Sequence, residues 1–311
     1  MLRSGYHGRV SALATKSQLR KENLIVPLII RENEQYGPLN TISMNDVSNF
    51  LQKIHKSRIK NIMIFGIPKF RNITGSEAWN PKGIVQTLVR QIKHSFDGQF
   101  NVITDTCLCQ YNQSGHCGLI DRNHVNDDKS LKAILNIALS QAESGSNVIA
   151  PSCMIDGQVK LIREKLDSNG FKNVKIMSFA TKMASSLYSP FRATAYDNST
   201  KPIDKSSYQL SFSNIAESMQ EVKLDIDEGA NMIILKPSMF YLDLISRIKE
   251  KFRIPVAVQQ VSGEYYMIKA ASIRKLVDEK EWTIFLMMAL RRAGADLILS
   301  YNALEISKYL F

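Results

Sequence analysis

The sequence has few cysteines, few prolines and no long hydrophobic run. With 4 Cys and 9 Pro in 311 residues, it is neither a disulfide-scaffolded chain nor a proline-rich one. No apolar stretch approaches the roughly 20 residues that a membrane-spanning helix needs, which excludes a membrane protein of that kind. Hydrophobic residues make up 44% of the chain, a normal share that argues against disorder. The length therefore fits one large domain or two ordinary ones.

Acidic residues are fewer than basic ones, and the formal net charge is +11. A basic chain can bind nucleic acid, but the Lys and Arg residues are scattered and form no stripe interleaved with aromatics. We therefore expect no nucleic-acid partner and no membrane, and interpret the charge as a solvated surface that suits small anionic substrates.

Residues 1–21 carry five basic side chains, and no acidic residue precedes Glu22. This segment has no hydrophobic core of a secretory signal, so we interpret it as an extended arm, with an organellar presequence as the alternative. The expected division is an arm over residues 1–21 and a catalytic domain over 22–311. The sparse cysteines indicate a reducing compartment, so we expect the cytoplasm, or an organellar matrix if the arm is a presequence.

Eight short, continuously apolar runs alternate with amphipathic stretches, which is typical of parallel strands covered on both faces. The expected strands are Leu24–Ile30, Ile59–Gly66, Phe100–Asp105, Asn147–Ser152, Val174–Ala180, Asn231–Lys236, Pro255–Val261 and Ala295–Tyr301. The expected helices are Asp46–His55, Lys82–Ser95, Ser130–Ser144, Val159–Ser168, Ile215–Asp227, Tyr241–Lys251, Met267–Leu276 and Lys280–Arg292.

A glycine followed by a small residue and an Asn or Asp recurs just before three of the expected strands, at Gly145, Gly229 and Gly294. Glycine ends helices readily because it tolerates the left-handed conformation. The repeated order predicts a (β/α)₈ barrel. A doubly wound open sheet is the alternative, but no Gly-x-Gly-x-x-Gly follows the first strand.

Active sites of such barrels lie at the carboxyl ends of the strands. After the third strand, Cys107, Cys109 and Cys117 lie in a polar loop. Three thiolates can hold Zn²⁺ and leave a fourth position open, which predicts a catalytic zinc site; His116 is the rival fourth ligand. Cys153, after the fourth strand, is either an extra soft ligand or a small buried side chain, and we favour the latter.

Lysines end the fifth and sixth strands, at Lys182 and Lys236. Burial and a second nearby ammonium group both lower the pKa of a lysine, which frees its amine to attack a carbonyl and form a Schiff base. The alternative is that each lysine reaches solvent or pairs with a carboxylate. We favour two cooperating Schiff-base lysines.

The segment 183–210 has no apolar periodicity, and we expect a structureless lid there. Its cations, among them Arg192 and Lys205, suit a substrate carboxylate. Hydroxyl groups after the seventh and eighth strands, Ser262 and Tyr301, can bind a second carboxylate.

Together these motifs resemble the porphobilinogen synthase (5-aminolevulinate dehydratase) family, from about Leu24 to the C-terminus. The shared patterns are Asp-x-Cys-x-Cys…Gly-His-Cys-Gly, Ala-Pro-Ser-x-Met-x-Asp-Gly, Lys-x-Ala-Ser…Tyr-x-Pro-Phe-Arg, Lys-Pro…Tyr-Leu-Asp and Val-Ser-Gly-Glu-Tyr. The resemblance implies a lyase that condenses two 5-aminolevulinate molecules to porphobilinogen in haem biosynthesis. It also implies a homo-octamer held by N-terminal arms, catalytic Zn²⁺ and, in some members, an allosteric Mg²⁺.

The resemblance also implies roles for single residues. Lys236 would hold the P-side substrate and Lys182 the A-side substrate as Schiff bases, with Asp105 transferring protons. The remaining matches are substrate-binding residues: Ser152, Arg192, Lys205, Gln209, Ser262 and Tyr301. Cys107, Cys109 and Cys117 match the zinc ligands.

Three departures from the family pattern leave alternatives open. Cys153 replaces an Asp, Lys205 replaces a lid Arg, and Gln259 replaces a Tyr. Lysine lacks the bidentate fork of arginine, so a relative that condenses another amino-ketone or keto acid is one alternative. A weakly active binding or scaffold protein and a class I aldolase are the others.

Overall fold

The structure is a computed structural model that describes residues 19–32, 38–122, 124–196 and 204–310. Eight parallel strands form a closed barrel, because the last strand pairs with the first through Leu24 with Ile298 and Ile25 with Leu299. In barrel order the strands are β1 (Leu24–Arg31), β3 (Asn61–Ile67), β4 (Asn101–Thr106), β7 (Val148–Pro151), β8 (Lys175–Lys182), β9 (Met232–Lys236), β10 (Val256–Gln259) and β11 (Leu297–Leu299). The expected (β/α)₈ barrel is confirmed.

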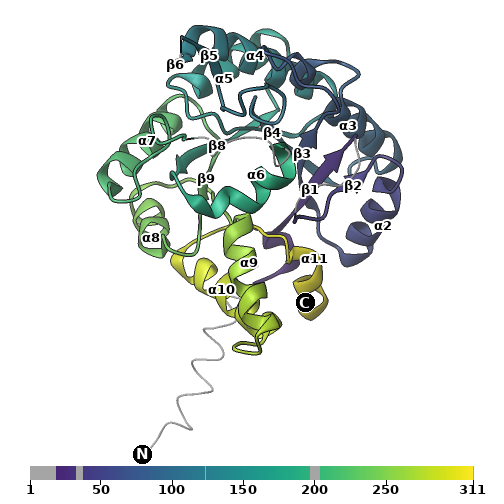
Figure 1. Ribbon diagram of the computed structural model, residues 1–311, viewed down its shortest axis with the longest axis vertical. Helices are drawn as coiled ribbons and strands as arrows, with labels where there is room; N and C mark the ends of the chain where they lie inside the picture. The colour runs from purple at the N-terminus through teal and green to yellow at the C-terminus, as the bar shows by residue number, and fades with distance from the viewer. Residues whose placement is uncertain (1–18, 33–37, 123, 197–203, 311) are drawn as a thin grey trace, which may run out of the picture.

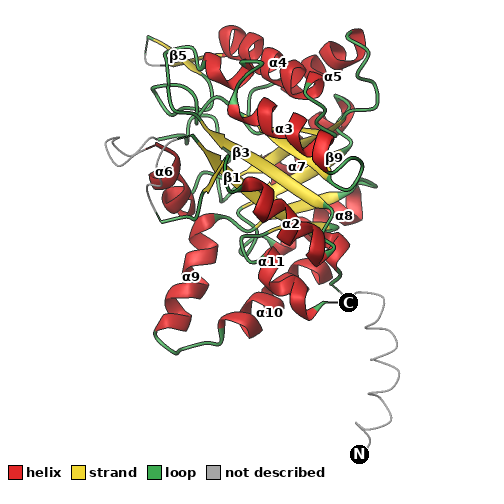
Figure 2. Ribbon diagram, turned by 90° about the vertical axis from the view of Figure 1, so that its right-hand side faces the viewer, coloured by secondary structure: helices red, strands yellow, loops and turns green. Residues whose placement is uncertain are grey.

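Helices surround the barrel and follow the strands in turn (Figure 1). They are α2 (Val47–Ser57), α3 (Ile84–Ser95), α4 (Asp127–Glu143), α5 (Gln158–Ser168), α6 (Ser189–Tyr196), α7 (Ile215–Asp227), α8 (Leu242–Lys251), α9 (Ser262–Ile273), α10 (Glu279–Ala293) and α11 (Ala303–Ile306). Short 3₁₀ turns are η2 (Lys21–Asn23), η3 (Ser76–Trp79), η4 (Ser186–Tyr188) and η5 (Ser307–Tyr309). Seen from the side, α9 and α10 project beyond the strands at one edge of the molecule (Figure 2).

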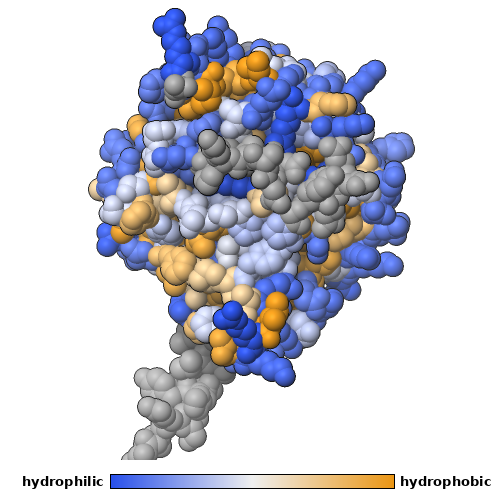
Figure 3. Space-filling model, in the orientation of Figure 1, coloured by the Kyte–Doolittle hydropathy of each residue, from blue (hydrophilic) through white to orange (hydrophobic). Residues whose placement is uncertain are grey.

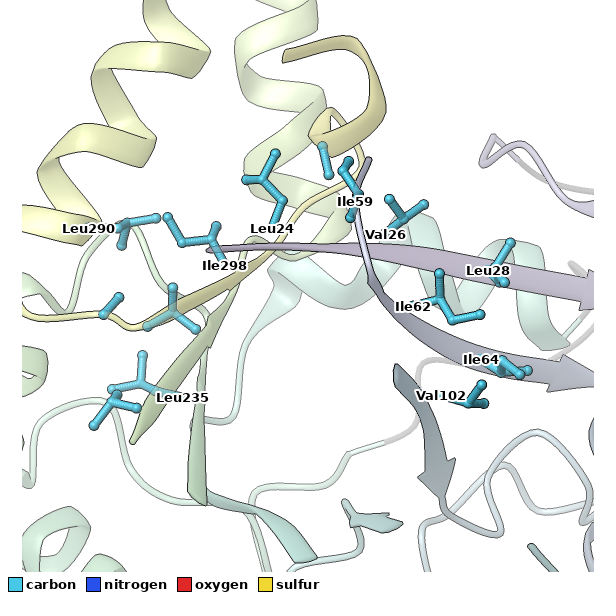
Figure 4. Packing of buried hydrophobic residues seen from close by; sticks show 14 of the residues in the cluster. Leu24, Val26, Leu28, Ile59, Ile62, Ile64, Val102, Leu235, Leu290 and Ile298 are labelled. Atoms are coloured by element: carbon cyan, nitrogen blue, oxygen red, sulfur yellow. The ribbon is translucent and has the colours of Figure 1, made fainter. Parts of the chain in front are cut away.

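Both faces of each strand are buried, which explains the continuous apolar runs. Along β1, Val26 and Leu28 point to the same side of the strand (Figure 4). They belong to one cluster with Leu51 of α2. The alternate residues Ile25 and Ile29 belong to a second cluster, which includes side chains of the other strands. This alternation follows from the two-residue period of a strand.

Two expectations are wrong in detail. The segment 183–210 is not structureless, because it contains η4 and α6, and its two ends, Met183 and Leu210, pair with each other in an isolated bridge. The helix expected over Met267–Leu276 begins earlier, at Ser262, separated from the end of β10 by two residues, and ends at Ile273. The short strand β2 (Ile42–Ser43) and the hairpin β5 (Leu119–Asp121) and β6 (His124–Asn126) are additions to the expected elements.

The glycines expected to end helices have positive φ angles of 105° at Gly145, 103° at Gly229 and 116° at Gly294. None of the described helices combines the length and the apolar content needed to cross a membrane. The expected N-terminal arm lies largely outside the described residues, as does Lys201, a further cation of the segment 183–210.

Candidate active site

The strand ends of the barrel bring the predicted residues to one cavity. Of the twelve predicted site residues, Cys107 alone does not line it. The lining residues are Phe65, Asp105, Cys109, Gln110, Cys117, Ser152, Lys182, Tyr188, Phe191, Arg192, Lys205, Gln209, Lys236, Gln259, Val261, Ser262 and Tyr301. Helix α6 lies over this end of the barrel (Figure 1).

Lys236 and Lys182 are register partners at the ends of the neighbouring strands β9 and β8. The Lys236 amine is buried and lies 4.1 Å from the centre of the Phe179 ring. Burial and the charge of Lys182 lower the pKa of Lys236 to about 8. About a tenth of this amine is therefore uncharged at pH 7, far more than for an ordinary lysine, and the uncharged amine is the form that attacks a carbonyl.

Lys182 lies in different surroundings. Its amine donates a hydrogen bond to the Ser152 carbonyl and lies 3.4 Å from the sulfur of Cys117. Burial lowers the pKa of Lys182, but the negative charge of the nearby cysteine sulfurs outweighs burial and raises this pKa above its ordinary value. The two lysines are thus level with each other, but their pKa values are shifted in opposite directions.

The sulfur atoms of Cys107, Cys109 and Cys117 are buried and lie within 4.8 Å of one another. Cys107 and Cys109 follow β4 directly, and their sulfurs are 3.2 Å apart. Hydrogen bonds from both thiols lower the pKa of Cys117 well below its ordinary value. Three converging sulfur donors, one of them readily ionised, fit a thiophilic metal ion such as Zn²⁺.

His116 and Cys153 lie outside this three-sulfur group. The Nδ1 atom of His116 is 3.1 Å from the Tyr208 hydroxyl, which also accepts a hydrogen bond from the backbone N–H of Cys117. Cys153 is buried and its thiol faces the Thr106 carbonyl at 3.7 Å.

Asp105, at the end of β4, is buried and held from both sides. One carboxylate oxygen accepts a hydrogen bond from the Ser152 hydroxyl at 2.8 Å, and the other accepts one from the Gln110 amide at 3.1 Å. These bonds fix the carboxylate in the cavity. Sequence reasoning missed Gln110, because a glutamine inside the cysteine loop carries no distinctive pattern.

The lid segment 183–210 contributes two cations to the cavity. Arg192, on α6, stacks over the Tyr188 ring at 5.5 Å, and Lys205 is buried with its amine 3.5 Å from the Cys117 sulfur. Ser262 connects the lid to the barrel, because its hydroxyl accepts a hydrogen bond from the backbone N–H of Phe191 at 3.0 Å.

Tyr188 and Glu264 support the lysine strands and were not predicted as site residues. The Tyr188 hydroxyl contacts the backbone carbonyls of Met183 at 2.7 Å and Lys236 at 3.3 Å. The Tyr-x-Pro-Phe-Arg pattern that includes Tyr188 was the available signal. Glu264 is fully buried, and its carboxylate accepts hydrogen bonds from the backbone of Val261 and of Ser238.

A closed parallel barrel with paired lysines and a three-thiol group at its strand ends defines a barrel enzyme that acts on carbonyl compounds. The family model for delta-aminolevulinic acid dehydratase matches residues 2–309. The chain belongs to this family.

Known members of the family are similar to nearly the whole chain. The delta-aminolevulinic acid dehydratase of Methanothermus sociabilis is 41% identical over 98% of this chain and 97% of its own. The delta-aminolevulinic acid dehydratase of Bacillus subtilis is 38% identical over 96% of this chain and 94% of its own. A solved structure from Toxoplasma gondii, in complex with the reaction product porphobilinogen, has a TM-score of 0.92 and 31% identity over 97% of this chain and 88% of that one. The expected family and enzyme class are confirmed: the chain is a dehydratase of the lyase class in tetrapyrrole biosynthesis.

Proposed function

We propose that the chain condenses two molecules of 5-aminolevulinate to porphobilinogen through Schiff bases on Lys236 and Lys182. The observation that carries this proposal is the register pairing of the two lysines in one cavity, with the pKa of Lys236 lowered to about 8. Two ketone groups can be engaged side by side, as the joining of two identical keto acids requires.

The lysines divide the substrates between them. The neutral amine of Lys236 attacks the ketone of the P-side molecule, and one water leaves as the imine forms. Lys182, whose pKa is raised, must first lose a proton and then forms an imine with the A-side molecule, again with release of one water. One carbon–carbon and one carbon–nitrogen bond then join the two molecules, both lysines are released, and two waters are lost overall. Asp105, held by Ser152 and Gln110, transfers protons at the reacting atoms.

Cations and hydroxyls around the cavity bind the two substrate carboxylates. Arg192, Lys205 and Gln209 approach from the lid and would bind the A-side carboxylate. Ser262 and Tyr301, from the ends of the last two strands, would bind the P-side carboxylate. Because a lysine gives a point charge without the fork of an arginine, Lys205 holds its carboxylate with less geometric selectivity.

Cys107, Cys109 and Cys117 would hold the metal ion on which the family depends, and we propose that it is Zn²⁺. Three sulfur donors suit Zn²⁺ and leave a position open to substrate. When bound there, Zn²⁺ supplies Lewis-acid polarisation of the A-side substrate.

A second cation, Mg²⁺, is proposed at a separate acidic pocket between α5 and α7. Asp156, Glu221, Asp225 and Glu228 line this pocket, and Gln158 contributes a buried amide oxygen that has no hydrogen-bond partner within the described ranges. Burial and the neighbouring carboxylates raise the pKa of Glu221. Oxygen-only donor sets of this kind suit Mg²⁺, and its binding is testable by Mg²⁺ titration of the Glu221→Gln variant.

We also propose a cytoplasmic homo-octamer. Apolar side chains are exposed on α9, on α10 and in the loop between them: Ile273, Leu276, Trp282 and Phe285. Apolar patches are visible at the lower end of the molecule in Figure 3. Exposed apolar groups of this kind are typical of subunit contacts. The mass in solution, measured by light scattering, tests the octamer.

The central experiment traps the imines. The protein is incubated with 5-aminolevulinate and borohydride, the modified peptides are mapped, and porphobilinogen is assayed in parallel without borohydride. We expect adducts on Lys236 and Lys182 and formation of porphobilinogen. The absence of both adducts would overturn the proposal. Adducts without porphobilinogen would favour a relative that condenses another amino-ketone, the alternative that Lys205 and Gln259 motivate.

A further inference from the structure

Gln141 lies on helix α4, away from the substrate cavity, and its side chain is buried against the end of β4. The residue is 1% exposed and does not line the cavity. Its amide nitrogen Nε2 donates a hydrogen bond to the backbone carbonyl of Asp105 at 3.0 Å. Its amide oxygen Oε1 accepts hydrogen bonds from the hydroxyls of Thr104 at 3.0 Å and Thr106 at 2.6 Å. One side chain therefore holds three successive residues of the strand.

The pairing of β4 with β3 stops just before Asp105. The last register partners of these two strands are Ile64 and Thr104. On its other side β4 remains paired with β7, where Asp105 is the partner of Ala150. A buried carbonyl without a donor costs stability. The Gln141 amide supplies this donor to Asp105 at the point where pairing with β3 has ended.

The side chains at the end of β4 alternate between the helix and the cavity. Neighbouring side chains of a strand point to opposite sides, so Thr104 and Thr106 face Gln141 on α4. The Asp105 carboxylate lines the cavity, where two side chains of the site bond to its oxygens. Those two contacts hold the carboxylate itself, whereas Gln141 holds the strand behind it.

We propose that Gln141 is a positioning residue: by holding the end of β4 it sets where the Asp105 carboxylate lies relative to the reacting atoms. The inference rests on the proposed function, in which Asp105 transfers protons, and extends it to a residue that does not touch the substrate. Proton transfer needs heavy atoms about 2.6–3.2 Å apart. A small shift of the strand therefore slows the chemical step more than it weakens substrate binding.

The variant Gln141→Met tests the proposal, because methionine keeps the length of the side chain and removes both the donor and the acceptor. Steady-state formation of porphobilinogen gives kcat and KM. Borohydride trapping gives the concentration of 5-aminolevulinate for half-maximal modification of Lys236. We expect kcat to fall tenfold or more, whereas KM and the half-maximal concentration change less than threefold.

Gln86, on α3, provides the matched control. It is also 1% exposed, and its amide donates to the Ala78 carbonyl at 2.9 Å and to the hydroxyl of Ser140, the neighbour of Gln141 on α4, at 2.8 Å. Gln86→Met therefore removes a buried amide and loosens the same helix, but it breaks no bond to β4. We expect its kcat to stay within twofold of that of the unmodified protein.

Thr106→Val breaks the same contact from the side of the strand, with a side chain of nearly the same shape. We expect kcat to fall several-fold, again with little change in KM. Because Thr106 and Gln141 act on one strand end, their effects should not be independent. The loss of kcat in the double variant should be smaller than the product of the two single losses. If Gln141→Met does not fold, the separate effects of Thr106→Val on kcat and KM still test the proposal.

The remaining outcomes decide between the proposals. A fall in kcat as large in Gln86→Met as in Gln141→Met would overturn the positioning role. So would an unchanged kcat in Gln141→Met, or a rise in KM as large as the fall in kcat. Each of these results leaves the Schiff base on Lys236 intact. By contrast, absence of any Lys236 adduct and of porphobilinogen in the unmodified protein would contradict the proposed function itself.

Discussion

Lys182 and Lys236 lie at the same level of the barrel, but their surroundings shift their pKa values in opposite directions. Lys236 lies against the Phe179 ring, and burial lowers its pKa to about 8. The Lys182 amine lies 3.4 Å from the sulfur of Cys117, and the cysteine sulfurs raise its pKa. A charged Lys182 in turn helps to keep Lys236 neutral, because two adjacent ammonium groups repel each other.

Trapping at Lys236 is therefore expected to depend on pH. Below about pH 8 the amine is protonated, so the initial rate of adduct formation should fall roughly tenfold per pH unit. Lys182→Met removes the neighbouring charge that lowers the pKa of Lys236, so the midpoint should move to higher pH. The rate of borohydride trapping on the Lys236 peptide, measured from pH 6 to 10 for both proteins, checks this. A midpoint that does not move in Lys182→Met would refute the coupling.

Glu264 holds the chain that follows Lys236. Its carboxylate accepts backbone hydrogen bonds from Ser238, from Met239 and, at 2.6 Å, from Val261. It thereby connects the loop after β9 to the start of α9. Burial raises the pKa of Glu264 to about 7, although three N–H donors lower it. The short Val-Ser-Gly-Glu-Tyr pattern includes this residue, but nothing in the sequence shows that the loop of another strand bonds to it.

Glu264→Leu is expected to impair both stability and the reactivity of Lys236. It leaves three N–H groups unpaired, two of them buried at a cost of about 1–3 kcal/mol each, and it releases the Lys236 loop. Denaturant unfolding and the rate of trapping on the Lys236 peptide measure the two effects. Gln86→Leu is the control, since Gln86 is equally buried and bonds to Ala78 and Ser140 away from the cavity. If both variants trap at the normal rate, Glu264 has no positioning role.

Among the elements, strands were predicted within a few residues, because continuous apolar runs reflect burial on both faces. Helices that depend on tertiary contacts were not predicted correctly. The start of α9 lacks apolar periodicity, and the structure stabilises it by the bond between Glu264 and the backbone of Val261. Helix α6 is short and contains Pro190, and it depends on contacts with the barrel such as that of Ser262 with Phe191.

The last turn of α6 is held by arginines from elsewhere in the barrel. Arg31, at the end of β1, donates to the Thr194 carbonyl, and Arg71 donates to the Ala195 carbonyl. The final carbonyls of a helix have no partners within it and interact favourably with positive charge. These contacts hold the helix that carries Arg192 over the cavity.

Arg71→Leu is expected to raise the KM for 5-aminolevulinate several-fold with a smaller change in kcat, because Arg192 loses its fixed position. Steady-state kinetics measure both constants. Arg163→Leu is a matched control: Arg163 also donates to backbone carbonyls, those of Phe171 and Val174, and neither it nor its partners line the cavity. An equal rise of KM in both variants would show that general loosening, rather than α6, is responsible.

At the scale of the whole molecule, the eight strand–helix units in the sequence predict a closed barrel. They do not predict which side chains meet across the cavity. Cys107 and Cys109 are neighbours in sequence, and their pairing with Cys117 was predictable from one loop. The approach of Lys205 to Cys117 at 3.5 Å was not, because it depends on how the lid returns over the barrel. Local spacing thus predicts which three thiols converge, whereas only the folded chain shows what surrounds them.

A metal ion held by Cys107, Cys109 and Cys117 should stabilise the entire barrel, because the loop that carries them begins directly at β4. Binding to the native state alone adds about 2.7 kcal/mol at a free metal concentration of 100 times Kd. Chelation should therefore lower Tm and release Zn²⁺, and readdition should restore both. Cys117→Ser should abolish this shift, whereas Cys153→Ser should retain it, because Cys153 lies outside the three-sulfur group. Scanning calorimetry with metal analysis measures both quantities. A Zn²⁺-dependent shift that survives in Cys117→Ser, or is lost in Cys153→Ser, would move the metal site away from these three cysteines.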